Sequence, residues 1–455
     1  MRESSGEDGK QGNEGREMTA DGVNMGNEAV ERALAEYAAV GERYVRELER
    51  KGLVFAEANA GASRCAELRA ELAARGVQVR NAGASLSVGH LSPACVECTG
   101  NRGSETFSTT FKCHRDCYFC FNHNQPDYER FFREGCPWED TLARSAAENE
   151  SLACVGLTGG EPLLDFENAL RLLKRAAELW PDAHTRLYTS GDLLTEESAA
   201  LLQAAGLDEI RFSVKDDDAP DQQDRVIAAL SLAKRFIPSV MVEMPVIPGA
   251  KEHMQDLFRR FQEVGIDSIN LLEFCFPFCN WDEFARRGFV LKNPPFEVMY
   301  DYGYSGGLAV DGSEELILEL MRWALDEGLT FGMHYCSLEN KHRSEIRQKN
   351  EPAAQAHPCL VFDEGDFFLK TAKVFGPDIP VARPVLEAAG CTDFMEDTDE
   401  DSLAFPLRYL DVLRDLTRPD GAPLTLMTCF FVHEHDEGGS YLIDVALRPA
   451  SEYEG

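Results

Sequence analysis

Three cysteines stand close together in residues 111–120, whose sequence is Phe-Lys-Cys-His-Arg-Asp-Cys-Tyr-Phe-Cys. Cys113, Cys117 and Cys120 have the spacing C-x3-C-x2-C and directly follow an apolar run that is expected to form a strand. Cysteine thiolates are the usual ligands of iron–sulfur clusters. Three thiolates on one tight loop can hold three corners of a four-iron cluster, and the fourth iron is then free to bind a small molecule.

The cysteine triplet on its own leaves a structural zinc site open. His123 follows Cys120 at a spacing that would complete a Cys3His set with Cys113 and Cys117. Such a set of four ligands satisfies the tetrahedral coordination of zinc.

A glycine-rich motif follows further along the chain, at the end of the next expected strand. Its sequence over residues 156–162 is Gly-Leu-Thr-Gly-Gly-Glu-Pro. Glycine has no β-carbon, so the backbone there can approach a ligand closely. Together with the cysteine triplet and the strand–loop–strand context, this motif resembles the radical S-adenosylmethionine (radical SAM) superfamily. The Pro-Val-Ile-Pro-Gly segment and the order of the motifs look most like the pyruvate formate-lyase activating enzyme-like branch.

The resemblance implies a set of cofactors and contacts. Cys113, Cys117 and Cys120 would hold a [4Fe–4S] cluster, and the methionine end of SAM would bind the open iron. A side chain placed at Gly160 would then hinder SAM binding and leave the cluster intact. The residues implied as SAM contacts are Phe119, Thr158, Gly159, Gly160, Glu161, Pro162, Ser190, Ser213, Lys215, Val246 and Ile247. Each strand-end residue of this set could instead be a capping or core residue, and residues 245–249 depart from the glycine pattern that the family usually has around an isoleucine.

The chemistry implied by the resemblance is an oxidoreductase reaction. The reduced cluster passes one electron to SAM, which breaks into methionine and a 5′-deoxyadenosyl radical that abstracts hydrogen from a substrate. An electron donor such as flavodoxin or ferredoxin and an anaerobic setting are expected. The substrate, a small molecule or a polypeptide, stays open, and so does a role as a glycyl-radical-enzyme activase. The alternative of a different class is a zinc-stabilised, barrel-type binding protein without radical chemistry.

Further cysteines fall near strand ends, where an active site would face. Cys275 and Cys336 are candidates for relaying a hydrogen atom or anchoring a substrate, and Glu273 for contacting a polar part of it. Cys95 and Cys98 form a C-x2-C pair, half of a zinc knuckle or of a second cluster. The partners considered for that pair are Cys275 with Cys279, or Cys336 with Cys359. Buried or incidental thiols are the simpler alternative.

A basic segment, residues 334–349, stands out in an acidic chain. It contains Lys341, Arg343, Arg347 and Lys349. Such a run is usually a solvated helix face. Because it begins at the end of the last expected strand, we also consider a role in binding an anion.

Short apolar runs alternate with amphipathic helical stretches through the middle of the chain. Strands are expected at residues 106–111, 154–157, 185–188, 209–214, 240–246, 268–274 and 330–334. Helices are expected at 166–179, 195–205 and 313–327, among others. This alternation predicts βαβ units and a parallel sheet. The expected fold is therefore an α/β protein built on a complete or partial (β/α) barrel of the radical SAM type, with its site at the carboxyl ends of the strands.

The regions outside the barrel differ in composition. Residues 1–26 are rich in Gly, Glu and Asn and are expected to be a disordered tail. Residues 27–104 are expected to be an N-terminal helical region, broken at Gly61, with a linker. Residues 105–350 are the expected radical SAM core, and residues 351–455 an α+β appendage that contains a hairpin around 434–440.

The net charge and the cysteine content limit the partners and the location that we expect for this protein. The 455 residues include 45 Lys and Arg against 79 Asp and Glu, a net charge of −34. Such a charge argues against nucleic acid and anionic membranes as partners. We find no apolar stretch long enough for a membrane helix and no signal peptide. The expected location is the cytoplasm, where the 14 cysteines would be thiols, ligands or catalysts.

The tail provides a first test. Residues 1–26 lack the apolar surface needed to offset the entropy lost on ordering. We expect limited proteolysis to remove them and to leave reductive SAM cleavage unchanged, as measured by 5′-deoxyadenosine formation before and after trimming. Loss of that activity on trimming would show that the tail is part of the working structure.

Overall fold

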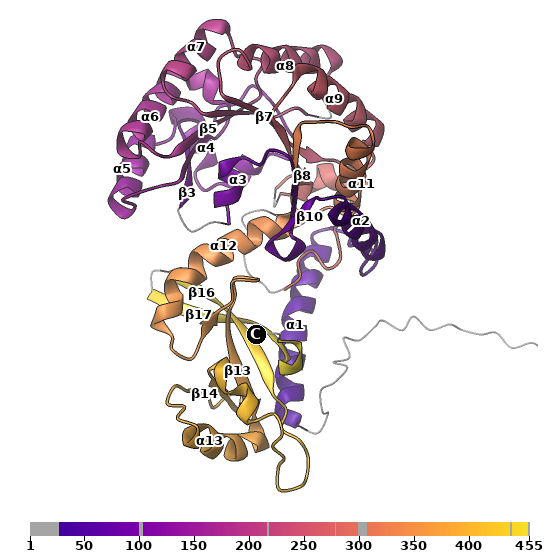
Figure 1. Cartoon of the computed structure of the whole chain (residues 1–455), viewed down its shortest axis with the longest axis vertical. Helices are drawn as coiled ribbons and strands as arrows, with labels where there is room; N and C mark the ends of the chain where they lie inside the picture. Colours follow the sequence, from indigo (N-terminus) through magenta and orange to yellow (C-terminus); the bar gives the residue numbers. More distant parts are fainter. Residues whose placement is uncertain are drawn as a thin grey trace, which may run out of the picture.

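The computed structural model describes residues 27–99, 103–215, 218–277, 279–298, 307–436 and 439–453. The tail predicted at 1–26 lies outside these residues. Figure 1 shows a large body of strands and helices above a smaller sheet, with helices α1 (Glu28–Arg50) and α12 (Leu338–Ala353) running between the two. None of the helices among the described residues is long and apolar enough to cross a membrane.

The large body is built on a nine-stranded sheet with the order β1-β2-β11-β8-β7-β6-β5-β4-β3. Seven neighbouring strands are parallel, from β11 to β3, and each corresponds to one of the predicted strands. Their bounds are Ser104–Ser108 (β3), Cys154–Thr158 (β4), His184–Thr189 (β5), Glu209–Phe212 (β6), Ser239–Val246 (β7), Ser268–Glu273 (β8) and Gly332–Cys336 (β11). Because β1 and β3 are the two edges of this sheet, the predicted barrel is confirmed in its partial form.

A ring of helices covers the outer face of the sheet (Figure 1). Neighbours in this ring contact one another, as α8 does with α9 and α11 does with both α9 and α2. The helices are Ala62–Ala74 (α2), Trp138–Glu148 (α5), Phe166–Leu179 (α6), Glu196–Ala204 (α7), Pro220–Ala233 (α8), Lys251–Val264 (α9) and Ser313–Asp326 (α11). Their apolar faces bury Leu173, Leu230 and Met321 in one core with the outward side chains of the strands. The 3.6-residue periodicity in the sequence therefore corresponds to a single buried interface.

The segment predicted as a linker contains structure that the sequence pattern did not reveal. It forms β1 (Gln78–Arg80), β2 (Ser85–Val88) and the short helix α3 (Pro93–Glu97). Strand β2 pairs antiparallel with β11 and extends the sheet. Helix α3 lies on the inner side of the sheet, where Ser92 and Cys95 contact the Arg211 guanidinium at 2.8 Å and 3.4 Å.

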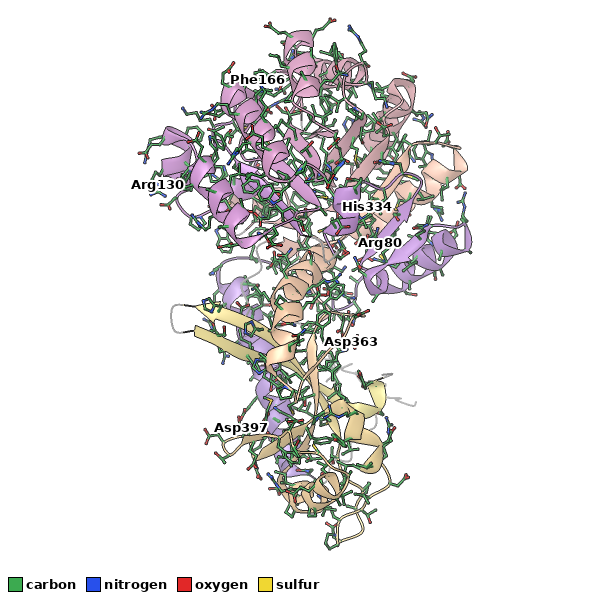
Figure 2. The ribbon with its side chains drawn as sticks, turned by 60° about the vertical axis from the view of Figure 1, so that its left-hand side comes forward. Arg80, Arg130, Phe166, His334, Asp363 and Asp397 are labelled. Atoms are coloured by element: carbon green, nitrogen blue, oxygen red, sulfur yellow. The ribbon has the colours of Figure 1, made fainter. Side chains whose placement is uncertain are left out.

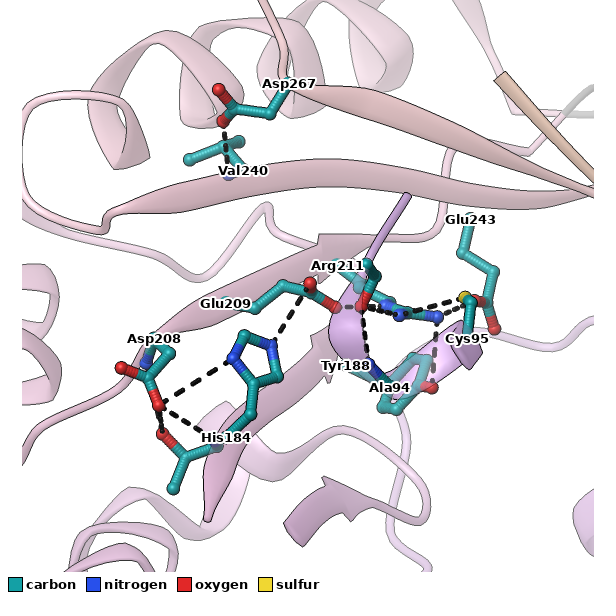
Figure 3. A network of polar contacts seen from close by, with 12 residues as sticks. Ala94, Cys95, His184, Tyr188, Asp208, Glu209, Arg211, Val240, Glu243 and Asp267 are labelled. Atoms are coloured by element: carbon teal, nitrogen blue, oxygen red, sulfur yellow. Dashed lines mark hydrogen bonds and ion pairs between the residues drawn. The ribbon is translucent and has the colours of Figure 1, made fainter. Parts of the chain in front are cut away.

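The interior of the partial barrel holds an ion-pair network (Figure 3). Arg211 of β6 donates to Glu209 and to Glu243 of β7, each at 2.5 Å. Glu243 also accepts from Asn270 of β8 at 2.7 Å. The interior of a closed (β/α) barrel is usually filled by branched apolar side chains. Here the buried charges are compensated by one another, which a buried ion pair requires.

The smaller body is an antiparallel sheet with the order β14-β15-β13-β16-β17, with β12 paired to β13. The strands are Val361–Phe362 (β12), Leu369–Phe375 (β13), Met395–Asp397 (β14), Ser402–Phe405 (β15), Met427–Asp436 (β16) and Gly439–Pro449 (β17). Helix α13 (Ile379–Ala388) packs on it. The predicted hairpin is the β16–β17 pair.

Two helices fasten the smaller sheet to the barrel. Helix α1 is capped by Asn27, whose amide donates to the Phe375 carbonyl at 3.1 Å, and its buried face packs against β13 and β17. Helix α12 starts at the end of β11, and Asn350 near its other end donates to the Phe431 carbonyl of β16. The first helix of the chain thus lies on the C-terminal sheet, and the boundary predicted between residues 350 and 351 falls inside α12. The division into domains stays a prediction.

The Glu209–Arg211 pair gives a pH-dependent stability. Burial alone raises the pKa of Glu209, but Arg211 and hydrogen bonds from His184 and Ser92 lower it from 4.5 to about 2. A carboxylate with a lowered folded-state pKa stabilises the protein above pH 4.5, and this contribution is lost as the pH falls through about 2. The shift corresponds to a free energy on the order of 3 kcal/mol.

We therefore expect Glu209→Gln to flatten the pH dependence of unfolding. The measurement is the free energy of chemical unfolding between about pH 5 and about pH 2. Glu178→Gln, which removes an exposed partner of Arg175, is the matched control. If both variants lose stability on acidification as steeply as the unmodified protein, the pair does not have the predicted effect.

Candidate functional site

A large cavity opens at the carboxyl ends of the parallel strands, as the sequence predicts. About 1240 Å³ of space, including its open mouth, is lined by residues at the ends of β4, β5, β6, β7 and β8 and by one residue of α12. The cavity lies outside the carboxyl ends of the parallel strands, where folds of this kind bind their ligands.

The cysteine loop, residues 109–120, follows β3 and forms one wall of the cavity. Cys113, Cys117 and Cys120 all line it. Arg115 in the same loop pairs with Asp192 at 3.2 Å and with Asp218 at 2.9 Å, which fixes the loop to the ends of β5 and β6. The three thiols are thereby held facing one space.

Two of the three thiols have raised pKa values and are therefore protonated before a metal centre binds. Burial raises the pKa of Cys113 and brings that of Cys120 to about 11. Thiols of this kind lose their protons when a metal centre binds, so binding is linked to proton release. The donor set of three thiols on one cavity wall fits a [4Fe–4S] cluster with one open iron.

The zinc alternative that the sequence left open involves His123, which lines the cavity together with the three cysteines. The His123 ring lies against Tyr128, with ring centres 4.5 Å apart. In the described residues no three His, Cys, Asp or Glu side chains, the cysteine triplet included, are placed as ligands of a single metal ion.

The glycine loop, residues 159–162, packs directly on the cysteine loop. Gly160 N donates to the Thr110 carbonyl at 2.9 Å, and Glu161 N donates to the Lys112 carbonyl at 2.8 Å. A β-carbon at Gly160 would lie 2.1 Å from the Lys112 carbonyl oxygen. A side chain at Gly160 would therefore displace the cysteine loop, so we now expect it to weaken cluster binding in addition to SAM binding.

Glu161 joins the glycine loop to the neighbouring strand end. Its buried carboxylate accepts from the Thr189 hydroxyl at 2.8 Å and from the Ser190 hydroxyl at 2.6 Å. It also accepts from the backbone N–H groups of Ser190 and Leu163. Glu161 and Ser190 line the cavity, but these contacts make them residues that position the loop.

Most of the predicted cofactor contacts come together in the cavity. Those that line it are Phe119, Thr158, Gly159, Gly160, Glu161, Ser190, Ser213 and Lys215, and Cys275 lines it too. Pro162 starts a short 3-10 helix, Pro162–Asp165, outside the lining. Val246 and Ile247 are buried in two separate hydrophobic cores and do not line the cavity. Strand alternation explains the position of Val246, because Pro245 lines the cavity and Val246 points the other way, whereas Ile247 lies beyond the end of β7.

The remaining candidate cysteines are spread over several places. Cys275 lines the cavity, whereas Cys336 is buried beside it and contacts the Asn340 amide at 3.6 Å. Burial raises the pKa of both thiols to about 12, so both stay protonated at neutral pH. Cys359 lies in the smaller body against Thr371. Within the described residues these cysteines form no second metal-binding group.

The sequence analysis missed several residues of the cavity. Arg115, Asn122, Tyr188, Arg211 and Glu243 all line it. Asn122 donates to the Gly159 carbonyl at 2.5 Å, so it too holds the glycine loop. Near the ends of β6 and β7, Arg211 and Glu243 each lie between two apolar residues. A charged residue in such a position of a predicted strand is the sequence signal that could have identified these two cavity residues.

The basic segment does not form one surface. His334 of β11 lies near Arg80 of β1 (Figure 2), and its ring contacts the Ser85 hydroxyl at 2.8 Å. Burial and the nearby Arg211 and Arg80 lower the pKa of His334 to about 3, so it is neutral. Of this segment only Lys341 lines the cavity.

Comparison with known proteins agrees with this geometry. Residues 107–261, which include both loops and strands β4 to β7, match the family model of the radical SAM superfamily. These residues form a radical SAM domain. The cofactors characteristic of the family are a [4Fe–4S] cluster and SAM, and the thiols and glycine loop of the cavity fit them.

One curated relative and several solved structures are similar to larger parts of the chain. A protein of Methanocaldococcus jannaschii, provisionally named a glycyl-radical enzyme activating enzyme, is 26% identical over 63% of this chain and 74% of its own length. Streptococcus suis SuiB bound to S-adenosylmethionine has a TM-score of 0.37 and 16% identity over 58% of this chain and 55% of that chain. Coproporphyrinogen III oxidase (HemN) from Escherichia coli has a TM-score of 0.34 and 16% identity over 52% of this chain and 55% of that chain. This chain thus covers less than two thirds of each of these two solved chains.

The contact between the two loops of the radical SAM domain gives a test. Gly160→Ala places a methyl group against the Lys112 carbonyl, and such overpacking typically costs about 1–3 kcal/mol. We expect a loss of both bound iron and SAM affinity, measured by iron analysis after anaerobic reconstitution and by calorimetry.

Gly206→Ala is the control. Gly206 has a φ of +84°, but an added β-carbon there has no atom within 4 Å. That variant should lose stability from backbone strain and still bind iron and SAM. A Gly160→Ala protein that keeps its iron while losing only SAM would show that the two loops do not depend on each other.

Proposed function

We propose that this protein is a radical SAM enzyme that holds a [4Fe–4S] cluster at Cys113, Cys117 and Cys120 and cleaves SAM reductively. The observation that carries the proposal is that these three thiols and the Gly159–Gly160 backbone face one cavity at the strand ends. When bound, the cluster and SAM supply a 5′-deoxyadenosyl radical that takes a hydrogen atom from the substrate. The protein supplies position and exclusion of water.

Particular residues suit the cofactor end of the cavity. Lys215 lines it, and its ammonium is close enough to Cys113 and Cys120 to lower their pKa, although burial outweighs this effect. That position suits the carboxylate of SAM. Phe119 and Ser213 line the same space and suit its adenosyl part.

Cys275 is the candidate for a hydrogen relay. It lines the cavity, and because burial raises its pKa to about 12 it keeps its S–H bond at neutral pH. The thiol can give its hydrogen atom to a substrate radical, which leaves a thiyl radical that one electron and one proton restore. An electron donor such as flavodoxin or ferredoxin would supply this electron, as it supplies the one for SAM cleavage.

A second candidate function is activation of a glycyl-radical enzyme. The name of the Methanocaldococcus jannaschii relative favours it. In that case the substrate is a glycine in a polypeptide partner, and the protein works under anaerobic conditions.

The decisive test of the proposed function is removal of the three thiols. Changing Cys113, Cys117 and Cys120 together to Ala should abolish both the iron–sulfur chromophore and 5′-deoxyadenosine formation from SAM with dithionite as reductant. The readouts are iron and sulfide content, the absorption spectrum and product analysis after anaerobic reconstitution.

The matched control changes three cysteines that do not line the cavity, Cys65, Cys136 and Cys391, to Ala. This variant should keep the cluster and the reaction. Full iron content in the first triple variant, or none in the unmodified protein, would contradict the proposed function.

A further inference from the structure

Helix α12 carries four cationic side chains, and three of them are neutralised by carboxylates. Arg343 pairs with Glu339 at 3.2 Å, Arg347 with Glu351 at 3.0 Å, and Lys349 with Glu434 at 2.7 Å. Lys341 differs from these three. Among the described residues no carboxylate lies within ion-pairing distance of its ammonium, and no hydrogen bond to that ammonium is formed.

The Lys341 side chain lies in the wall of the cavity, among groups that do not neutralise it. The groups that act on it electrostatically are the thiols of Cys275, Cys336 and Cys98 and the carboxylate of Glu243. That carboxylate is already bound by Arg211 and Asn270. Burial lowers the pKa of Lys341 and the Glu243 carboxylate raises it, whereas Cys275 and Cys336 are protonated at neutral pH and bring no charge to the ammonium.

Lys341 is half-buried, and an ammonium held partly out of water without an anionic partner costs free energy. A protein that keeps such a group at a cavity wall has a binding site that a ligand of opposite charge completes. The same reasoning does not apply to Arg343, Arg347 and Lys349, because their partners are supplied by the chain.

Lys341 does not belong to the end of the cavity that suits SAM. Lys215 acts electrostatically on Cys113 and Cys120, whereas Lys341 acts on Cys275 and Cys336. Its helix follows β11, at the opposite end of the parallel row from β3 and the cysteine loop. The two lysines thus lie next to different cysteines of one cavity.

We propose that Lys341 binds the carboxylate of a small organic monocarboxylic acid that is the substrate, next to Cys275. This inference rests on the proposed radical SAM function and names its substrate class. A single free ammonium matches a single negative charge, because the nearby carboxylates Glu243 and Glu273 are already paired with Arg211 and Lys292 and leave no second cation for another one. Leu272 and Phe274 also line this part and would contact an apolar body of the acid.

The test uses straight-chain perdeuterated carboxylates from propionate to octanoate, each compared with its primary amide. With reconstituted full-length protein, SAM and dithionite, we expect deuterium to pass from at least one carboxylate into 5′-deoxyadenosine. In this step the substrate C–D bond breaks, the 5′ C–D bond forms, and a carbon radical stays on the acid, which one electron from dithionite and one proton from water convert to a C–H group. The amides should transfer tenfold less. Binding is measured independently, as the rise in unfolding temperature that each compound causes at constant ionic strength.

Three variants separate the possible outcomes. Lys341→Met should reduce two quantities by tenfold or more: the rise in unfolding temperature that the carboxylate causes, and the transfer of deuterium to 5′-deoxyadenosine. Lys341→Arg should restore part of both. Lys349→Met, on the same helix and outside the cavity, should change neither. Because replacing an unpaired buried charge by an apolar side chain of similar volume removes a cost, Lys341→Met should fold with unchanged or higher stability.

The proposal is overturned if no carboxylate is preferred over its amide, or if Lys341→Met and Lys349→Met behave alike. It is also overturned if Lys341→Met weakens SAM binding measured by calorimetry as much as carboxylate binding, because Lys341 would then hold SAM. Absence of any 5′-deoxyadenosine from the unmodified protein with SAM alone would instead refute the proposed function on which this inference rests.

Discussion

The site depends on a backbone contact between two loops. Beyond the ends of β3 and β4 the hydrogen bonds from Gly160 N and Glu161 N to the cysteine loop continue the pairing of the two strands. This contact leaves no room for a side chain at Gly160. The three thiols therefore face the cavity because the chain next to them is held at backbone distance. The glycine motif acts on the cysteines as well as on any ligand.

A second constraint comes from the charges inside the partial barrel. The sheet does not close, so its interior could not be a simple apolar core like that of a complete barrel. Arg211 joins β6 to β7 through Glu243, and it also reaches the segment around α3 on the inner side of the sheet. These contacts place Glu243 in the cavity wall with its charge already neutralised. An interior network thus sets which charges remain available to a ligand.

Much of this architecture follows from the sequence, and the exceptions have physical causes. All seven parallel strands were predicted because short, mainly apolar runs such as 154–157 and 240–246 alternate with amphipathic helical stretches. Strand β2 was missed, since Ser85–Val88 is short and alternates with serine. Val246 and Ile247 were expected at the cofactor, but alternation along β7 turns Val246 into the core.

In the candidate site, too, some residues could be predicted from the sequence and others could not. The cysteine triplet and the glycine loop could be recognised because each consists of residues that lie close together in the chain. The roles of Arg211 and Lys341 could not, since each depends on partners far away in the chain. Whether a lysine in a basic segment is neutralised is decided by tertiary contacts, and here Lys349 meets Glu434 while Lys341 meets thiols.

Helix α12 has a consequence for how the two bodies work together. Its first turns carry Lys341 at the cavity wall, and its last turns are held by Asn350 on the C-terminal sheet. At 1.5 Å per residue its 16 residues span about 24 Å. The same helix thus carries a cavity residue near one end and is hydrogen-bonded to the C-terminal sheet near the other. A change in how that sheet packs against α12 would therefore change the position of Lys341 in the cavity wall.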